Sequence, residues 1–129
     1  MNTKIFCPAV IAMLSLLIST TAMAQSNKIY RIAKIQVDPA QLAQYKAALK
    51  EQMATAIKAE PGVLSYYALS DKKNESQITI FECYADSTAY NSHIQTAHFK
   101  KYKETVQQMV KSLEITDVDV IGSAKKPGM

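Results

Sequence analysis

An apolar strand that leads directly into a capped helix is the feature that most restricts the fold of this chain. Residues 77–85 alternate in their side chains as a strand with one buried face does. Asp86 follows at once, and Asp is among the preferred residues at a helix N-cap. Glu82 lies inside the strand, where a carboxylate without a partner is costly to bury. We therefore expect Glu82 to orient a histidine, to pair with Arg31 or Lys34, or to point outward at a sheet edge.

The helical segment after Asp86 carries two apolar stripes that cannot share one face. Tyr90 and Phe99 are nine residues apart, so at about 100° per residue they point in opposite directions on a continuous helix. A break is therefore expected near residues 95–97, with His93 and His98 on either side of it, where the mouth of a cavity could form. The first stripe contains Tyr90, Ile94 and Ala97, and the second contains Phe99, Tyr102, Val106, Val110 and Leu113.

Three further strands and one long helix are expected around this stretch. The strands are residues 28–37, 63–70 and 114–121. The helix begins at Asp38-Pro39, because Asp caps a helix and proline loses no needed hydrogen bond at the first position. It ends at Glu60-Pro61-Gly62, since the residue before proline avoids the helical region. Its buried stripe is predicted to contain Leu42, Tyr45, Leu49, Met53, Ala56 and Ile57.

The order strand, helix, strand, strand, helix, strand predicts an α+β fold of the ferredoxin-like βαββαβ type. In such a fold a four-stranded antiparallel sheet carries its helices on one face. The uncovered face would expose apolar side chains, which a soluble monomer rarely tolerates. Dimerisation through the two sheets would cover that face.

The first 24 residues read as a secretory signal peptide rather than as part of the domain. Lys4 gives a positive start, the apolar run 5–18 is too short to span a bilayer, and Ala22-Met23-Ala24 is a cleavage site of the A-x-A type. A retained membrane anchor is the alternative. We expect a periplasmic or secreted protein, cleaved after Ala24 and not inserted in the membrane, with a domain at 25–129, a core at about 28–121 and a flexible tail at 122–129.

Charge and cysteine content argue against a nucleic-acid partner and against a structural metal. The formal charge is only +4, and the one dense basic run, residues 100–103, is typical of a solvated helix face. Cys83 is the only cysteine after cleavage, and its place in an apolar strand predicts burial without a disulfide. Neither a Cys-x-x-Cys nor a His-Glu-x-x-His motif occurs, so no metal is expected.

The strand and the helix together resemble the antibiotic biosynthesis monooxygenase family. Its members often read E-x-Y-x-D, then A-x-x-x-H, then H-F. The resemblance implies a dimeric α+β barrel and an enzyme that oxidises a quinol or a similar electron-rich aromatic with molecular oxygen and without a cofactor. The matching residues here are Glu82, Tyr84, Asp86, Ala89, His93, His98 and Phe99.

The resemblance also implies that His93 is the catalytic base and that Glu82 orients it. From the residues alone, His93 has a second interpretation, a histidine hydrogen-bonded to a backbone carbonyl at a helix end. With a pKa of about 10 for a phenol and about 6.5 for histidine, the proton transfer is uphill by about 5 kcal/mol, so the substrate anion must be stabilised as well. Substrate contacts are expected from Arg31, Tyr66, Tyr67, Tyr90, His98, Phe99 and Tyr102, with only one of the two adjacent tyrosines facing the interior.

Relatives with other activities leave the substrate open. Haem-degrading members have an asparagine, a tryptophan and a histidine where this chain has Ala33, His93 and Lys103, so haem degradation is not expected. Relatives that process a linear signalling sugar share the histidine-rich helix. Two other functions therefore stay open: a binding module without catalysis, and an isomerase or degradative enzyme for a small hydroxylated carbonyl compound.

Overall fold

The computed structural model of the chain describes residues 26–129. The predicted signal peptide and its cleavage after Ala24 lie outside the described residues. Within the described part, none of the helices has the length and apolar character needed to cross a membrane.

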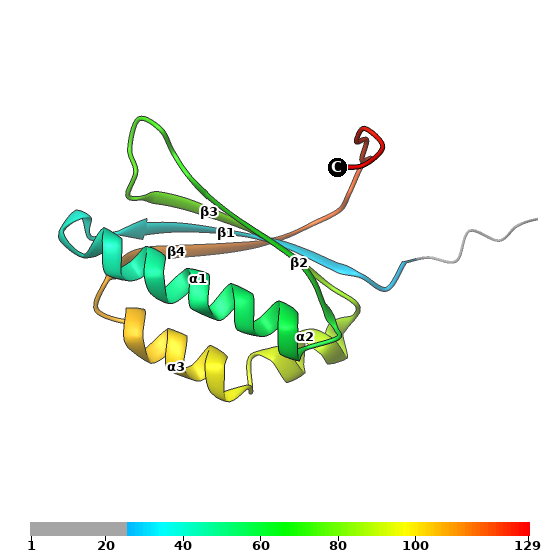
Figure 1. Cartoon of the computed structure of the whole chain (residues 1–129), viewed down its shortest axis with the longest axis horizontal. Coiled ribbons are helices and arrows are strands. Elements are labelled where there is room, and N and C mark those ends of the chain that lie inside the picture. The colour runs from blue at the N-terminus through cyan, green and yellow to red at the C-terminus, as the bar shows by residue number, and fades with distance from the viewer. Residues whose placement is uncertain (1–25) are drawn as a thin grey trace, which may run out of the picture.

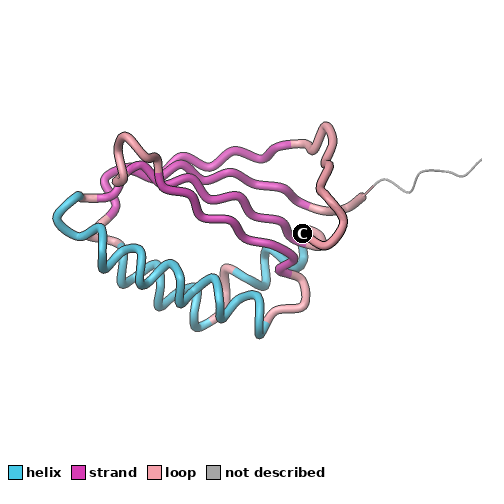
Figure 2. Tube along the Cα trace, turned by 45° about the horizontal axis from the view of Figure 1, so that its top comes forward, coloured by secondary structure: helices cyan, strands magenta, loops and turns pink. Residues whose placement is uncertain are grey.

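A four-stranded antiparallel sheet carries three helices on one of its faces (Figure 1). The strand order is β2-β3-β1-β4, so the first and third strands lie in the centre. This confirms the predicted ferredoxin-like α+β fold, and Figure 2 shows the helices as a separate layer below the strands. The elements are β1 (Ile29–Val37), a 3-10 turn η1 (Pro39–Gln41), α1 (Leu42–Ala59), β2 (Val63–Ser70), β3 (Gln77–Tyr84), α2 (Ser87–His93), α3 (Ala97–Val106) and β4 (Val110–Val118).

Side-chain caps set where the helices begin. The Asp38 carboxylate accepts a hydrogen bond from the backbone N–H of Ala40 at 3.0 Å, and Asp86 accepts one from Ala89 at 2.8 Å. Thr96 caps α3 through its hydroxyl and so separates α3 from α2. The predicted helix break is therefore confirmed, and the Thr96 hydroxyl stabilises it by accepting a hydrogen bond from the backbone N–H of Phe99, the third residue of α3.

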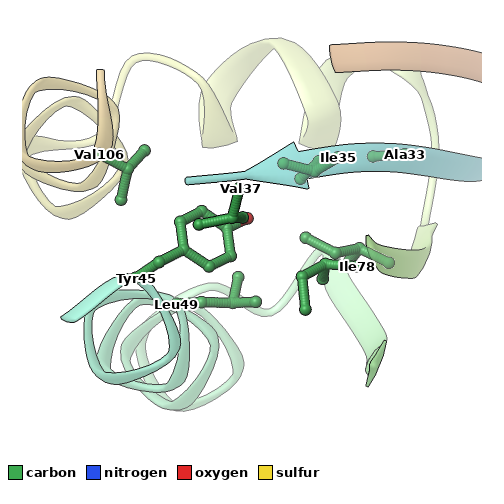
Figure 3. Packing of buried hydrophobic residues seen from close by; sticks show 8 residues of the cluster. Ala33, Ile35, Val37, Tyr45, Leu49, Ile78 and Val106 are labelled. Carbon is green, nitrogen blue, oxygen red and sulfur yellow. The ribbon is translucent and has the colours of Figure 1, made fainter. Parts of the chain in front are cut away.

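The main core lies between α1, α3 and the inner face of the sheet. Figure 3 shows Tyr45 and Leu49 of α1 directed toward Val37, with Val106 of α3 beside them. The predicted stripe of α1 is wrong at one position, because Ile57 is 47% exposed whereas Gln52 is buried. Ile57 lies at the flank of the helix, where it lines an open surface pocket together with Met53 and Tyr66. The buried residues of this core are Ala33, Ile35, Val37, Tyr45, Leu49, Ile78, Ile80 and Val106.

The last strand begins four residues earlier than the predicted range 114–121. Val110 and Leu113 belong to β4 rather than to the helix, which ends at Val106. Val37 pairs with Val110 and Ile35 pairs with Leu113, so β4 has one more residue than β1 between these two pairs, which is a β-bulge. This bulge turns both side chains to the inner face, and their spacing of three residues therefore imitates a helical repeat.

A second bulge decides which of the adjacent tyrosines faces inward. Val63 pairs with Tyr84, whereas Ser65 pairs with Cys83, so Leu64 is the extra residue of β2. As a result Tyr66 lies opposite Glu82 on the inner face. Cys83 is on the outer face and buried, as its sequence context predicted.

The outer face of the sheet carries an apolar surface that no helix of residues 26–129 covers (Figures 1 and 2). Tyr67 is 62% exposed and Leu69 is 58% exposed on this face. Tyr67 lies beside Phe81, with ring centroids 6.5 Å apart, and Tyr30 stacks on the other side of Phe81 at 6.1 Å. We call Tyr30, Ile32, Tyr67, Leu69 and Phe81 the outer apolar face.

Gly62 lets the end of α1 approach α2 closely. A Cβ atom at this position would overlap the Cβ of Ala89, whereas a Cβ at Gly122 would meet nothing. The residue before Pro61 is Glu60, so this close approach also brings Glu60 toward α2. Small side chains at 62 and 89 are therefore part of what positions the end of α1.

Gly62→Ala is expected to lower the free energy of unfolding by about 1–3 kcal/mol, because the added methyl group overpacks the contact. Chemical denaturation measures this change. Gly122→Ala is the control, and the double variant Gly62→Ala/Ala89→Gly should lose less than the two single changes together. Additive losses would show that the two positions do not meet.

Candidate functional site

A cavity of about 490 Å³ lies between the inner face of the sheet and helices α1 and α3. Its volume is in the range of small-molecule sites. The wall combines aromatic rings with charged groups. Arg31 from β1 and Glu82 from β3 lie on the sheet side, and the exposed Lys103 and Glu104 of α3 also line the cavity. The tyrosine and phenylalanine side chains on the wall are Tyr66, Tyr84, Tyr90, Phe99 and Tyr102. The fold thus provides a hollow suited to a flat aromatic ligand with polar substituents.

Glu82 is held at the wall by a row of tyrosine hydroxyls rather than by a histidine. The Tyr84 hydroxyl donates a hydrogen bond to Oε2 of Glu82 at 2.9 Å. The hydroxyls of Tyr84 and Tyr66 are 2.9 Å apart, and that of Tyr66 lies 2.8 Å from Nε2 of His93. Two hydroxyls therefore lie between Glu82 and His93, and the expected direct contact between these two residues is not made.

His93 lies behind the cavity wall, because its side chain is 1% exposed and it does not line the cavity. Its Nδ1 atom lies 2.8 Å from Oε2 of Glu60, at the end of α1. The same oxygen lies 2.7 Å from Nε2 of His98, whose side chain is 21% exposed. The carboxylate that orients His93 is therefore Glu60, and the cavity meets His93 only through Tyr66. We call the row Glu82, Tyr84, Tyr66, His93, Glu60 and His98 the hydrogen-bond chain.

Burial changes the acidity of the groups on the wall. It raises the pKa of the Glu82 carboxyl, while the hydrogen bond from Tyr84 and the charge of Arg31 act in the opposite direction. Burial also raises the pKa values of Tyr66 and Tyr84, so both side chains stay neutral hydroxyls. On the sheet side of the wall, negative charge is therefore carried by Glu82 rather than by a tyrosine.

Arg31 supplies positive charge on the sheet side of the wall. Its Nε atom lies 2.6 Å from Oδ1 of Asp117 on β4, and its guanidinium group lies 4.0 Å from the ring centroid of Tyr90. The hydrogen bond to Asp117 raises the pKa of Arg31 and lowers that of Asp117. The inward arginine thus has the acidic partner that its position in an apolar strand requires.

The structure places the other predicted contact residues in three different environments. Tyr90, Phe99 and Tyr102 line the cavity, as expected. Tyr67 is on the outer apolar face and does not line the cavity, so Tyr66 is the one of the two adjacent tyrosines that faces the interior. His98 lies next to a smaller pocket between α1 and α3 rather than on the cavity wall.

Three residues of the site were not identified from the sequence. Glu60 was interpreted only as a helix end, and Tyr84 only as part of the family motif. Gln52 lines the cavity from α1, is 5% exposed, and neither atom of its side-chain amide has a partner among residues 26–129. Leaving a buried amide unpaired costs free energy, so Gln52 is available to hydrogen-bond a ligand. Its position within the otherwise apolar stripe of α1 was the one available signal.

The cluster Glu60, His93 and His98 has the residue types of a metal site, with its ligand atoms within 4.8 Å of one another. Ligand atoms of a tetrahedral zinc ion are about 3.3 Å apart, because each lies about 2.0–2.1 Å from the metal. The two N···O distances here, 2.8 and 2.7 Å, are instead those of hydrogen bonds. We therefore describe the cluster as a hydrogen-bonded group.

Comparison with known proteins identifies the family. The family model for antibiotic biosynthesis monooxygenase matches residues 28–105. A candidate antibiotic biosynthesis monooxygenase from Bacteroides thetaiotaomicron has a solved structure that is 44% identical, covers 78% of this chain and 95% of its own, and superposes with a TM-score of 0.74. No curated protein matches the chain.

Two further solved structures share the fold. A candidate monooxygenase from Lactobacillus acidophilus is 32% identical over 73% of this chain, with a TM-score of 0.70, and this chain spans 45% of that protein. A candidate antibiotic biosynthesis monooxygenase from Caulobacter crescentus is 24% identical over 75% of this chain and 92% of its own, with a TM-score of 0.70, which shows the fold alone. With the family match across β1 to α3 and the 44% identical relative, this chain belongs to the antibiotic biosynthesis monooxygenase family.

Proposed function

We propose that this protein oxidises a quinol or a related electron-rich aromatic compound with molecular oxygen and without a resident cofactor. Family membership supports a monooxygenase-like activity in general. The observation that carries the finer proposal is the pairing of Glu82 and Arg31 on the wall of an aromatic cavity. One group can accept the substrate proton, and the other can stabilise the anion that remains.

In this proposal Glu82, rather than His93, is the base that meets the substrate. Glu82 reaches the cavity, whereas His93 is separated from it by Tyr66. Burial raises the pKa of the Glu82 carboxyl, so transfer of a phenol proton to Glu82 is less uphill than transfer to an ordinary carboxyl group. The positive charge of Arg31 favours the phenolate over the phenol in the same cavity. His93 acts as a positioning residue, because it holds the Tyr66 hydroxyl.

The quinol and molecular oxygen together supply all the electrons and atoms that the proposed reaction needs. Loss of a proton makes the quinol a strong electron donor toward molecular oxygen. One oxygen atom enters the ring, the other leaves as water, and the quinol becomes a hydroxyquinone. The protein has to bind the ring, remove the proton and keep bulk water from the intermediate, which the aromatic wall is suited to do.

Oxygen uptake with a chemically reduced naphthoquinol, in chelator-treated buffer and corrected for uptake without enzyme, tests this proposal. The wild type should consume oxygen, and Glu82→Gln should lower kcat by about 100-fold or more, which is the usual loss on removing a general base. Gln52→Met keeps the side-chain length and removes the amide, so it should raise KM and leave kcat nearly unchanged.

Other outcomes of the same experiment would contradict the proposal. Turnover that continues without oxygen would favour an isomerase or a degradative enzyme for a hydroxylated carbonyl compound. An aromatic compound that raises the Tm and is recovered unaltered would favour a binding module. Unchanged kcat in Glu82→Gln would remove Glu82 from the mechanism.

The raised pKa of Glu82 predicts how stability changes with pH. Between its ordinary pKa of about 4.3 and the higher value in the fold, the folded state binds more protons than the unfolded state. The free energy of unfolding contributed by this group therefore falls as the pH rises through that window, by at most about 1.4 kcal/mol per pH unit. Glu82→Gln removes this contribution and keeps an oxygen acceptor for the Tyr84 hydroxyl.

We expect Glu82→Gln to match the wild type in Tm near pH 4 and to exceed it at pH 7. Thermal unfolding followed by circular dichroism at both pH values measures the difference. Glu51→Gln on the exposed side of α1 is the control and should show no such pH-dependent gain, because exposed ion pairs contribute little. The prediction is wrong if the Tm of Glu82→Gln minus the Tm of the wild type is lower at pH 7 than at pH 4.

We also propose that the protein is a homodimer in which the outer apolar face of each protomer packs on that of the other. The exposed Tyr67 and Leu69 support this, since an apolar sheet face of this kind marks an interface in a soluble protein. Leu69→Lys should convert the dimer to a folded monomer in sedimentation equilibrium. Ile57→Lys, at an exposed position on α1, should leave the association unchanged. A wild type that sediments as a monomer would reject the proposal.

A further inference from the structure

The hydrogen-bond chain is continuous from the cavity wall to a partly exposed histidine. Its five contacts measure 2.9, 2.9, 2.8, 2.8 and 2.7 Å from Glu82 to His98. All five are within hydrogen-bond distance, so each contact needs one proton between its two heavy atoms. Without that proton, two acceptors would face each other in a buried place.

Counting donors shows that the chain is one proton short when both carboxyl groups are ionised. Each of the two tyrosine hydroxyls supplies one proton, His98 supplies one from Nε2, and a neutral His93 supplies one. Four protons then serve five contacts. A fifth proton is therefore required, and the only places for it are His93 and the two carboxyl groups.

Three arrangements of the fifth proton satisfy every contact. In the first, Glu82 is ionised and accepts from Tyr84, Tyr84 accepts from Tyr66, Tyr66 accepts from Nε2 of His93, and His93 carries a proton on each ring nitrogen. In the second, Glu82 holds the proton, these three contacts reverse, and His93 is neutral with its proton on Nδ1. Glu60 accepts from both histidines in these two arrangements. In the third, Glu60 holds the proton and donates to Nδ1 of a neutral His93, but a carboxylate is ordinarily a weaker base than an imidazole, so we retain the first two.

Glu82 and His93, the two residues that can hold the fifth proton, have similar surroundings. Arg31 of β1, the cross-strand neighbour of Glu82, favours an ionised carboxylate, but Arg31 is also paired with Asp117 of β4. Oε2 of Glu60 lies 2.8 Å from Nδ1 of His93, and the fully buried ring of His93 packs beside the rings of Tyr84 and Phe99. Each of the two residues thus has one neighbour that can carry the opposite charge and an otherwise apolar setting.

We propose that Glu82 and His93 share a single proton through the hydroxyls of Tyr84 and Tyr66, so that the two residues titrate as one unit. Glu82 is the end that meets a ligand, and His93 is the end that stores the proton away from it. The catalytic use of this unit rests on the proposed function, but the shared proton itself does not.

During catalysis the transfer balances at every atom. Before the reaction Glu82 holds the proton and Nε2 of His93 is free. The proton on Glu82 passes to Tyr84, that of Tyr84 to Tyr66, and that of Tyr66 to Nε2 of His93, which leaves Glu82 ionised. The O–H bond of the substrate then breaks, its electron pair stays on the substrate oxygen, and the proton binds Glu82. Each hydroxyl gains one proton and loses one, so only the substrate and His93 change charge.

Nuclear magnetic resonance of the ligand-free protein, labelled at glutamate and histidine, tests the shared proton. The ¹³C shift of the Glu82 carboxyl and the ¹⁵N shifts of the His93 ring should change with common midpoints as the pH is varied, as coupled sites do. Tyr66→Phe removes one hydroxyl and keeps the ring. In this variant the two midpoints should separate by about one pH unit or more, because each residue then titrates alone.

Tyr45→Phe is the matched control, since the Tyr45 hydroxyl bonds that of Tyr102 at 2.9 Å in a second tyrosine pair outside the chain. It should leave the common midpoints intact. Should Tyr66→Phe fail to fold, Tyr84→Phe cuts the next contact and should have the same effect. Separate midpoints in the wild type, or common midpoints that survive loss of a chain hydroxyl, would overturn the proposal. This measurement does not use oxygen uptake. The shared proton can therefore be disproved while the proposed function stands, and the proposed function can be disproved while the shared proton stands.

Discussion

One carboxylate holds the ends of three helices together, and the arrangement of the site depends on it. Glu60 directly follows α1, His93 is the last residue of α2, and His98 is the second residue of α3. Both histidines lie within hydrogen-bond distance of the same oxygen of Glu60. A buried imidazole needs a partner for each ring nitrogen, so the contact of Nδ1 with Glu60 turns Nε2 toward Tyr66. The packing of helix ends thereby fixes a hydroxyl on the cavity wall.

The tyrosine hydroxyls connect the two ionisable ends because they remain neutral. Burial raises the pKa values of Tyr66 and Tyr84, which excludes a tyrosinate on the wall at ordinary pH. A neutral hydroxyl can accept one proton and donate another, so it can transmit a change of polarity without carrying charge itself. Charge on the sheet side of the cavity is then carried by Glu82 and Arg31, whose opposite signs suit the proposed substrate, which loses a proton and becomes an anion.

Local patterns predicted most of the fold, and non-local pairing decided what they missed. The helix break followed from two stripes half a turn out of phase, and a Thr96 cap accounts for it. Val110 and Leu113 were assigned to the helix because a bulge in β4 gives a strand the spacing of a helix, and no local signal marks a bulge. A bulge also decides that Tyr66 rather than Tyr67 faces inward. The contact of Glu60 with His93 joins residues 33 apart, so periodicity could not reveal it.

Arg31 links the observed structure to the proposed reaction, because its ion pair with Asp117 is weaker than an ion pair with a ligand inside the cavity would be. Asp117 is 66% exposed, and an ion pair open to water contributes little, typically less than about 1 kcal/mol. An anionic ligand in the cavity would meet the same guanidinium group away from bulk water, where the attraction is stronger. Because Tyr90 supports the guanidinium plane from its ring face, the group stays in place when its hydrogen bonds change. In the proposed reaction Arg31 would therefore exchange Asp117 for a substrate oxygen at small cost, which would make the exposed edge of β4 part of the site.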